Sequence, residues 1–436
     1  MADKSDYTRE SLLYGSDVLV IYRDPVTPPK PAPGQPGTHS NFTPHEPEIF
    51  IAVLSDSHIV AFNGHVDLGT GIRTALAQIV AEELSVAFDS VTMVLGNSVE
   101  APNQGPTIAS ASIQITAEPL RRAAAQAREY LLTLAAKHFD TERSLLSCQN
   151  GAITPSDNNR SSVSFGELLL GTRHALKLAD EVPLKPVSHY TLVGQSTSRV
   201  DIPAKATGQL TFIHDLRLPN MLHGRVIRPP YVGHDSGDFI GNSLIAVDES
   251  SVAHLPGVIS VVVVGDFVGV VAEREEQAAA AAKQLKIQWR PIEGLPQLDN
   301  IEQALLDLPS KQRILLEEGD LDNALAAAQH PLNRHYVWPF QLHGSIGPSC
   351  SVADANEDGL YVWSGTQNPH SLRADLARLT GLDEGVITIT RMETSGCYGR
   401  NCADDVGADA VLLSQAVGRP VRVQLTREQE HTWEPK

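Results

Sequence analysis

The sequence contains little cysteine, and its cysteines are not arranged as metal ligands. Among 436 residues there are four, Cys148, Cys350, Cys397 and Cys402, and no two form a Cys-x-x-Cys pair. The sixteen histidines show no His-Glu-x-x-His or similar spacing. These absences argue against a disulfide scaffold, a zinc finger, a self-contained iron–sulfur cluster or any metal ligated by this chain. A reducing cytoplasm is therefore the expected location.

Long apolar runs and positive charge are also scarce. No stretch approaches the ~18 uninterrupted apolar residues of a membrane span, and residues 1–6 lack the basic region of an export signal. The formal net charge is −18, and such a field repels phosphate backbones. We therefore expect neither a membrane span nor a nucleic-acid partner. The 42% of hydrophobic residues is ordinary for a folded protein.

Stretches rich in proline and glycine mark predicted boundaries along the chain. The segments between them show the apolar periodicity of strands and helices. Residues 24–48 are rich in both, so residues 1–47 are predicted to form an extended N-terminal arm. In residues 48–185, the apolar spacing predicts a strand pair, three helices and one further strand. The segments are a strand pair over 49–62, helices over 72–84, 113–137 and 161–180, and a strand over 91–95.

Proline-rich stretches at 183–186 and 291–296 suggest two further boundaries. Between them, residues 200–292 are predicted to form a compact unit of short strands and one helix. Its strands are expected at 208–214, 223–227, 258–264, 268–271 and 286–289, and its helix at 275–285. Residues 300–436 then alternate strands with helices. The expected fold class is α+β.

Two segments ahead of helices could bind a ligand. Residues 64–71 (GHVDLGTG) are glycine-rich, and free N–H groups at a helix start suit phosphate, but for this segment taken alone the sterics of a tight turn are the favoured explanation of the glycines. Residues 104–112 (QGPTIASAS) are small and hydroxylated. Thr107, Ser110 and Ser112 could donate to an anionic or heteroaromatic ligand, or simply cap the helix.

Two later segments have a similar character. Gln367 ends a strand that opens into a helix, where α/β folds place ligand contacts, but for this segment taken alone a surface amide is favoured. Residues 394–401 (TSGCYGRN) follow a strand but contain neither a G-x-G-x-x-G pattern nor a Walker lysine. Cys397 could be a nucleophile, but a buried structural thiol is favoured. Asp404 and Asp405 are adjacent at a helix start, which favours capping over a catalytic carboxylate pair.

In their order along the chain, these segments resemble one family. Residues 64–84 together with 104–112 are similar to a molybdopterin-contacting block of the xanthine oxidase/aldehyde oxidase family of molybdenum hydroxylases. Residues 218–230 and 255–289 resemble its a/b hammerhead domain. Residues 339–354, 363–382 and 391–430 resemble its first molybdenum-cofactor-binding domain, here incomplete. The first block precedes the hammerhead domain. That permuted order is similar to the large subunits of bacterial nicotinate and isoquinoline dehydrogenases.

The resemblance implies roles for particular residues. Gln367 matches the glutamine beside the molybdenum and is the implied catalytic residue; the chain itself supplies no metal ligand. At Thr70 many relatives carry glutamine, so one polar contact differs here. The implied cofactor contacts are Gly69, Thr70, Gly71, Thr107, Ile108, Ala109, Ser110, Ser112, Gln367, Gly396, Cys397, Tyr398 and Gly399.

The implied activity is hydroxylation of an N-heteroaromatic compound such as nicotinate or isoquinoline, with water as the oxygen source. The implied cofactor is molybdenum–molybdopterin in its cytosine dinucleotide form, and electrons would pass to a separate subunit with 2Fe–2S clusters. The glutamate that serves the family as general base has no counterpart, so we expect the chain to be truncated or completed by a further chain, and inactive alone. Alternatives are an aldehyde oxidoreductase of the same family and a non-catalytic scaffold subunit for the cofactor.

Overall fold

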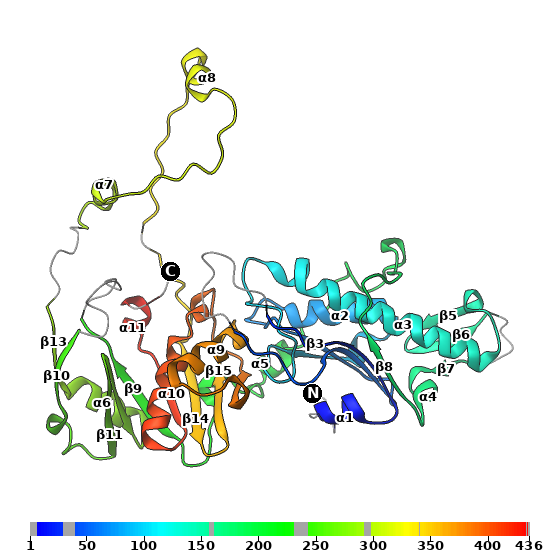
Figure 1. The fold of residues 1–436 in the computed structure, drawn as a ribbon, viewed down its shortest axis with the longest axis horizontal. Helices are drawn as coiled ribbons and strands as arrows, with labels where there is room; N and C mark the ends of the chain where they lie inside the picture. Colours follow the sequence, from blue (N-terminus) through cyan, green and yellow to red (C-terminus); the bar gives the residue numbers. More distant parts are fainter. Residues whose placement is uncertain are drawn as a thin grey trace.

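The fold consists of two lobes and one extended excursion. The computed structural model describes residues 7–28, 40–156, 161–230, 243–291, 298–339, 341–432 and 434. Figure 1 shows the N-terminal lobe, with α2 and α3, beside a C-terminal lobe that contains α6, α9 and α10. In the part of the chain that the structure describes, no helix is both long and apolar enough to cross a membrane.

The N-terminal lobe is built on a five-stranded sheet whose two faces are both buried. One face packs against α2 (Ile72–Leu84) and α3 (Ala117–Phe139), and the other against α1 (Arg9–Tyr14) (Figure 1). This is why the first strands are almost continuously apolar. The sheet order is β4 (Val91–Leu95), β3 (Ile59–Asn63), β2 (Glu48–Leu54), β1 (Val18–Arg23) and β8 (Arg173–Lys177).

Two predictions for this lobe are wrong in part. The N-terminal arm begins with structure, because α1 and β1 precede the proline-rich stretch and β1 lies between β2 and β8; residues 29–39 of the arm lie outside the described residues. The helix predicted over 161–180 is only α4 (Phe165–Leu169). It starts at the expected capping box of Ser164 and Glu167 and stops before Gly171, whose φ is 74°.

The C-terminal lobe is built on a seven-stranded sheet that joins distant parts of the sequence. Strand β9 pairs in parallel with β17, so residues 200–292 and 300–436 share one sheet. The strand predicted at 208–214 is absent from the described structure, which has a 3-10 turn at Ile213–Asp215 there. The sheet order is β11 (Val258–Val264), β12 (Phe267–Ala272), β9 (Leu222–Ile227), β17 (Val421–Gln424), β14 (Cys350–Asn356), β15 (Gly359–Ser364) and β16 (Ile387–Arg391).

Helices cover both faces of this sheet and explain two of its glycines. Helix α6 (Glu275–Gln284) closes a small core on one side, while α10 (Asp405–Val417) packs on the other. A Cβ at Gly224 or Gly269 would lie 2.5 or 2.7 Å from a methyl of Leu413. Three further helices are α5 (Ile202–Ala206), α9 (Pro369–Thr380) and α11 (Arg427–Thr432). Two small sheets consist of β5 (Leu146–Gln149), β6 (Ala152–Pro155) and β7 (Val163–Ser164), and of β10 (Leu244–Asp248) and β13 (Lys286–Trp289).

Residues 298–339 leave the C-terminal lobe as a long exposed excursion (Figure 1). It contains two short helices that the sequence did not predict, α7 (Ile301–Asp307) and α8 (Leu321–Ala327). Large apolar side chains on it face solvent: Leu315 is 80% exposed and Trp338 is 72% exposed. The excursion therefore contributes almost nothing to the described core.

We expect limited trypsin digestion to cut this excursion first. Lys311, Arg313 and Arg334 lie on exposed backbone with few tertiary contacts, whereas Arg225 and Arg422 lie in central strands. Mass spectrometry of the first fragments should place the cuts between residues 298 and 339. Early cleavage at Arg225 or Arg422, with the excursion protected, would contradict the arrangement.

Candidate functional site

Gln367 joins the two lobes. It follows β15, is 4% exposed, and exchanges two hydrogen bonds with the loop at residues 104–112. The Thr107 amide donates to the Gln367 carbonyl at 2.9 Å, and Gln367 Nε2 donates to the Thr107 carbonyl at 2.9 Å. The Thr107 hydroxyl in turn accepts from the Val66 amide at 3.0 Å. The alternative of a surface amide is therefore wrong, because the side chain is buried between two loops.

The loop at residues 394–399 reaches the other side of Gln367. Cys397 is fully buried, and its thiol donates to Gln367 Oε1 at 2.9 Å. Gly396 and Gly399 have φ angles of 108° and 117°, and Tyr398 between them has 60°. These left-handed residues turn the Cys397 side chain inward and leave Tyr398 59% exposed. Burial raises the pKa of the Cys397 thiol, which opposes the nucleophile hypothesis.

The loop at residues 104–112 presents unpaired donors at its tip. Ala109 and Ser110 are both exposed and left-handed, with φ of 52° and 56°. Within the described residues their amide N–H groups have no acceptor. The chain then enters a π-helical turn at Ser112–Thr116 that leads into α3. In the described structure no side chain caps this helix start, so the capping alternative is wrong, and the tip combines free amides with a helix N-terminus.

The strain at Ala109 gives a testable prediction. A left-handed alanine costs roughly 1–2 kcal/mol, so Ala109→Gly should leave the free energy of unfolding unchanged or raise it by up to about 1 kcal/mol. Ala111→Gly is the matched control, because Ala111 has φ of −80° and gains nothing. It should lower stability by roughly 0.5–1 kcal/mol. Chemical denaturation measures both, and equal losses in the two variants would contradict the left-handed conformation.

The turn at Gly69–Gly71 differs from its prediction. The amides of its two glycines are not free: the Asp67 carboxylate accepts from Gly69 at 2.9 Å, Gly71 at 3.2 Å and, beyond the turn, Arg73 at 3.0 Å. These bonds lower the pKa of Asp67 although its burial alone would raise it. The Gly69 carbonyl accepts from Arg199 at 2.7 Å. Thr70 remains exposed, so the turn can meet a ligand only through that residue and its outer surface.

The structure thus brings some predicted residues together and not others. Gln367, Thr107 and Cys397 are joined by hydrogen bonds, while Ser112 bonds His65 through a 2.7 Å contact between Oγ and Nδ1. Ile108, Ala109 and Ser110 lie at the tip of the loop at residues 104–112. The Gly69–Gly71 turn contacts Asp67 and Arg199 instead of Gln367.

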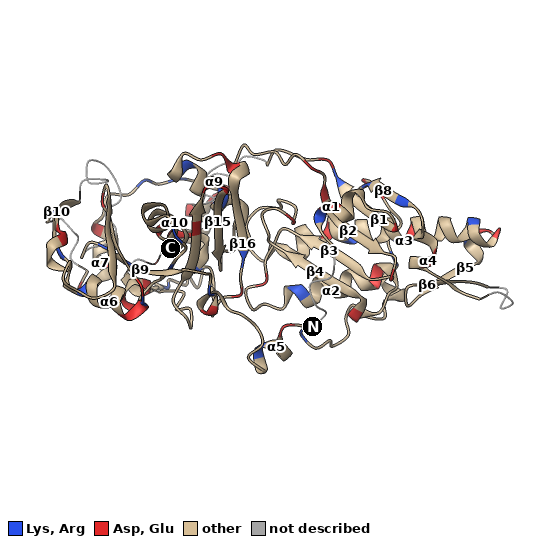
Figure 2. Ribbon diagram, turned by 90° about the horizontal axis from the view of Figure 1, so that it is seen from below, with Lys and Arg blue, Asp and Glu red and all other residues tan. Residues whose placement is uncertain are grey.

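A charge cluster that the sequence did not predict lies at the junction of the lobes. Glu393, just beyond β16, accepts from Arg391 at 2.7 Å and Arg73 at 3.3 Å, and lies 3.6 Å from Lys205. Arg391 also donates to the Asp67 carbonyl. Figure 2 shows β16 on the side of its lobe that faces the N-terminal lobe, with α5 near the junction. No local pattern could identify this cluster, because its members come from three distant segments, residues 67–73, Lys205 and residues 391–393.

Asp404 and Asp405 also differ from the predicted caps. Asp404 has φ of 53° and makes no side-chain capping bond. It is buried and accepts from the Thr366 hydroxyl at 2.6 Å, beside Gln367. Burial raises the pKa of Asp404 well above its usual range. Asp405 instead pairs with the buried Arg400 at 2.9 Å. Asp404 therefore supports the Gln367 loop through its hydrogen bond with Thr366.

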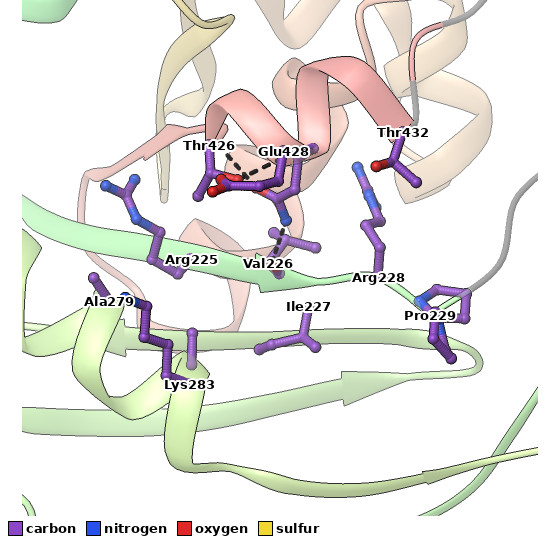
Figure 3. A pocket seen from close by; sticks show the side chains of 13 residues that line it. Arg225, Val226, Ile227, Arg228, Pro229, Ala279, Lys283, Thr426, Glu428 and Thr432 are labelled. Carbon is purple, nitrogen blue, oxygen red and sulfur yellow. Dashed lines mark hydrogen bonds between the residues drawn. The ribbon is translucent and has the colours of Figure 1, made fainter.

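A separate pocket lies between β9, α6 and α11 (Figure 3). Its volume is about 420 Å³, and Lys283 and Thr432 lie on opposite walls. Arg225 pairs with Glu275 at 2.6 Å, and Arg228 with Asp409 at 2.7 Å. Its lining residues include none of the residues predicted for the site. The pocket is therefore distinct from the loops that meet at Gln367.

Two models of known protein families match this chain. Residues 31–211 and 307–436 match two family models, each described as a molybdopterin cofactor-binding domain. The first model includes the loop at residues 104–112, and the second includes Gln367 and the loop at residues 394–399. The chain belongs to the xanthine oxidase/aldehyde oxidase family of molybdenum hydroxylases, as the sequence resemblance predicted.

The individual relatives agree with the predicted block order. A nicotinate dehydrogenase subunit from Pseudomonas putida is 60% identical over 430 residues, which cover 98% of this chain and 36% of that protein. The beta chain of isoquinoline 1-oxidoreductase from Brevundimonas diminuta is 25% identical over 88% of this chain and 54% of that one. The chain thus spans a third to a half of these relatives. Aldehyde oxidoreductase from Desulfovibrio gigas, a solved structure, matches 58% of this chain and 32% of its own at 19% identity, with a TM-score of 0.48.

Proposed function

We propose that this chain forms part of the molybdenum site of a hydroxylase that acts on an N-heteroaromatic compound of the nicotinate or isoquinoline type. The cofactor would be molybdenum–molybdopterin in the cytosine dinucleotide form, and a subunit with 2Fe–2S clusters would accept the electrons. The relative with 60% identity is named as a nicotinate dehydrogenase, and it is named as one subunit of that enzyme, which supports a partner chain.

One observation supports this proposal most strongly: three of the predicted cofactor segments meet around a single buried amide. Gln367 has two N–H donors, and within the described residues only one is used, toward Thr107. The free amides of Ala109 and Ser110 stand at the start of a long helix, an arrangement that binds phosphate. An amide donor beside an anion-binding tip fits a phosphorylated pterin.

The chain's own residues would hold this cofactor in two places. When bound, the cofactor supplies the two-electron oxidation chemistry of the reaction. The loop tip at Ala109 and Ser110 would bind its phosphate through backbone N–H groups. Gln367 would donate its second N–H to an oxygen of the cofactor, and its burial excludes competing water. Burial raises the pKa of Asp404, which disfavours a negative charge beside this donor.

Turnover by the enzyme that contains this chain, with its partner subunits, tests the proposal. We expect oxidation of nicotinate or isoquinoline, with isotope from labelled water in the product, and reduction of the iron–sulfur subunit. Selective oxidation of aromatic aldehydes would favour the aldehyde oxidoreductase alternative. Cofactor binding without turnover of either class would favour a scaffold subunit.

A further inference from the structure

We propose that Cys397 is a positioning residue, whose thiol fixes the orientation of the Gln367 side-chain amide by donating a hydrogen bond to it. We call Cys397 Sγ and Gln367 Oε1 the thiol–amide pair; they lie 2.9 Å apart. Both side chains are buried, at 0% and 4% exposure. The cofactor-facing role of Gln367 rests on the proposed function, but the thiol–amide pair does not.

The neighbouring groups determine which end of the Gln367 side-chain amide is the NH₂ group and which is the carbonyl oxygen. The Thr107 carbonyl can only accept a hydrogen bond, and it lies 2.9 Å from one end of the Gln367 amide. That end must therefore be the NH₂ group. The other end is the carbonyl oxygen, and it faces Cys397. Because a carbonyl oxygen cannot donate, the proton in the thiol–amide pair must belong to sulfur.

A thiolate at position 397 would be incompatible with this arrangement. It would face a carbonyl oxygen without an intervening proton, and rotating the amide would set its oxygen against the Thr107 carbonyl. Burial raises the pKa of Cys397, while the Asn401 amide, 3.4 Å from Sγ, opposes part of that rise. Cys397 therefore stays protonated and acts through its S–H bond.

The surrounding backbone holds the thiol in place. The Ser345 hydroxyl donates to the Cys397 carbonyl at 3.1 Å, and the backbone N–H of Gln367 donates to the Asn401 carbonyl at 3.3 Å. Asn401 Nδ2 donates to the Gly365 carbonyl at 3.0 Å. These contacts tie the loop with Cys397 to the loop with Gln367. Held there, the thiol and the Thr107 carbonyl together keep the Gln367 side chain in one orientation, with one N–H free for a ligand.

Infrared spectroscopy of the S–H stretch tests the thiol–amide pair in the whole chain. A hydrogen-bonded S–H absorbs at lower wavenumber than a free one. Cys350 is the matched control: it is 2% exposed, and in the described residues its thiol has no hydrogen-bond partner. We expect the band lost in Cys397→Ala to lie below the band lost in Cys350→Ala. In Gln367→Met, which lacks the acceptor, the Cys397 band should move up to the Cys350 position.

An unshifted Cys397 band, or no S–H band from Cys397 at all, would overturn the inference. If Cys397→Ala does not fold, the shift in Gln367→Met gives the same information. In the complete enzyme, Cys397→Ser keeps a donor and should retain turnover within a few-fold, whereas Cys397→Ala should lower kcat with little change in KM. Equal losses in both variants would also overturn it. A shifted band in protein that binds no molybdenum would leave the pair intact and contradict only the proposed function.

Discussion

Glu393→Gln should lower the free energy of unfolding by about 3–5 kcal/mol, the usual cost of removing one partner from a buried ion pair. Glu393 neutralises Arg391, whose side chain is only 3% exposed, and it also lies beside Arg73 and Lys205. Burial already lowers the pKa of Arg391, and Glu393 is the group that offsets this. Without the carboxylate, a buried guanidinium would remain unpaired at the junction of the lobes. Denaturant unfolding of the purified chain measures the loss.

Two further variants separate this effect from a general loss of charge. Arg73→Gln removes a partner that is 31% exposed, so it should cost no more than about 1 kcal/mol. The double variant Arg391→Met with Glu393→Leu removes the whole buried pair and should recover much of the stability lost in Glu393→Gln. A loss below about 1 kcal/mol in Glu393→Gln would show that the cluster does not hold the lobes together.

Gln367→Ala should reduce turnover of the complete enzyme by about 100- to 1,000-fold, the effect of losing one preorganised donor worth roughly 2.7–4 kcal/mol. The variant removes the free N–H together with both bonds that tie the Gln367 side chain to Thr107 and Cys397. Its stability should fall by less, about 1–3 kcal/mol, because a buried carbonyl and a thiol lose their partner. Steady-state kinetics and thermal unfolding on the same preparation compare the two losses.

Gln284→Ala is the matched control for this experiment. Gln284 is an exposed glutamine at the end of α6, far from the loops that meet at Gln367, and its replacement should change neither quantity. If Gln367→Ala keeps turnover within threefold of the unmodified enzyme, a difference below about 0.7 kcal/mol, the proposed role of Gln367 is wrong.

Local patterns in the sequence predicted much of the fold. Helix α2 and the strands β2 and β3 follow from apolar spacing, and the capping box at Ser164 marks the start of α4. Apolar spacing did not predict the pairing of strands that are far apart in the sequence. Strand β1 depends on a parallel partner, β8, and β9 on β17, and neither pairing leaves a local signal. The predicted boundary near residue 292 therefore separates two parts of one sheet.

The candidate site could likewise be predicted only in part from local sequence. Glycine and hydroxyl-bearing segments identified the loops, because such residues permit left-handed turns and donate hydrogen bonds. What the loops contact could not be predicted: Asp67 takes the donors of the Gly69–Gly71 turn, and Arg73 meets Glu393 across 320 residues of sequence. Buried Asp404 supports the Gln367 loop although its position suggested a cap.

The cofactor content of the complete enzyme shows whether this chain helps to bind molybdenum–molybdopterin. Protein purified from a molybdenum-replete host should contain molybdenum equimolar with this chain, and acid hydrolysis should release a cytidine nucleotide. A variant with Ser110→Pro removes one amide donor from the loop tip and cannot adopt its left-handed conformation, so it should lose both the metal and the nucleotide while the sheets stay folded. Folded enzyme that turns over its substrate without molybdenum, or a Ser110→Pro variant with full metal and nucleotide content, would contradict the account.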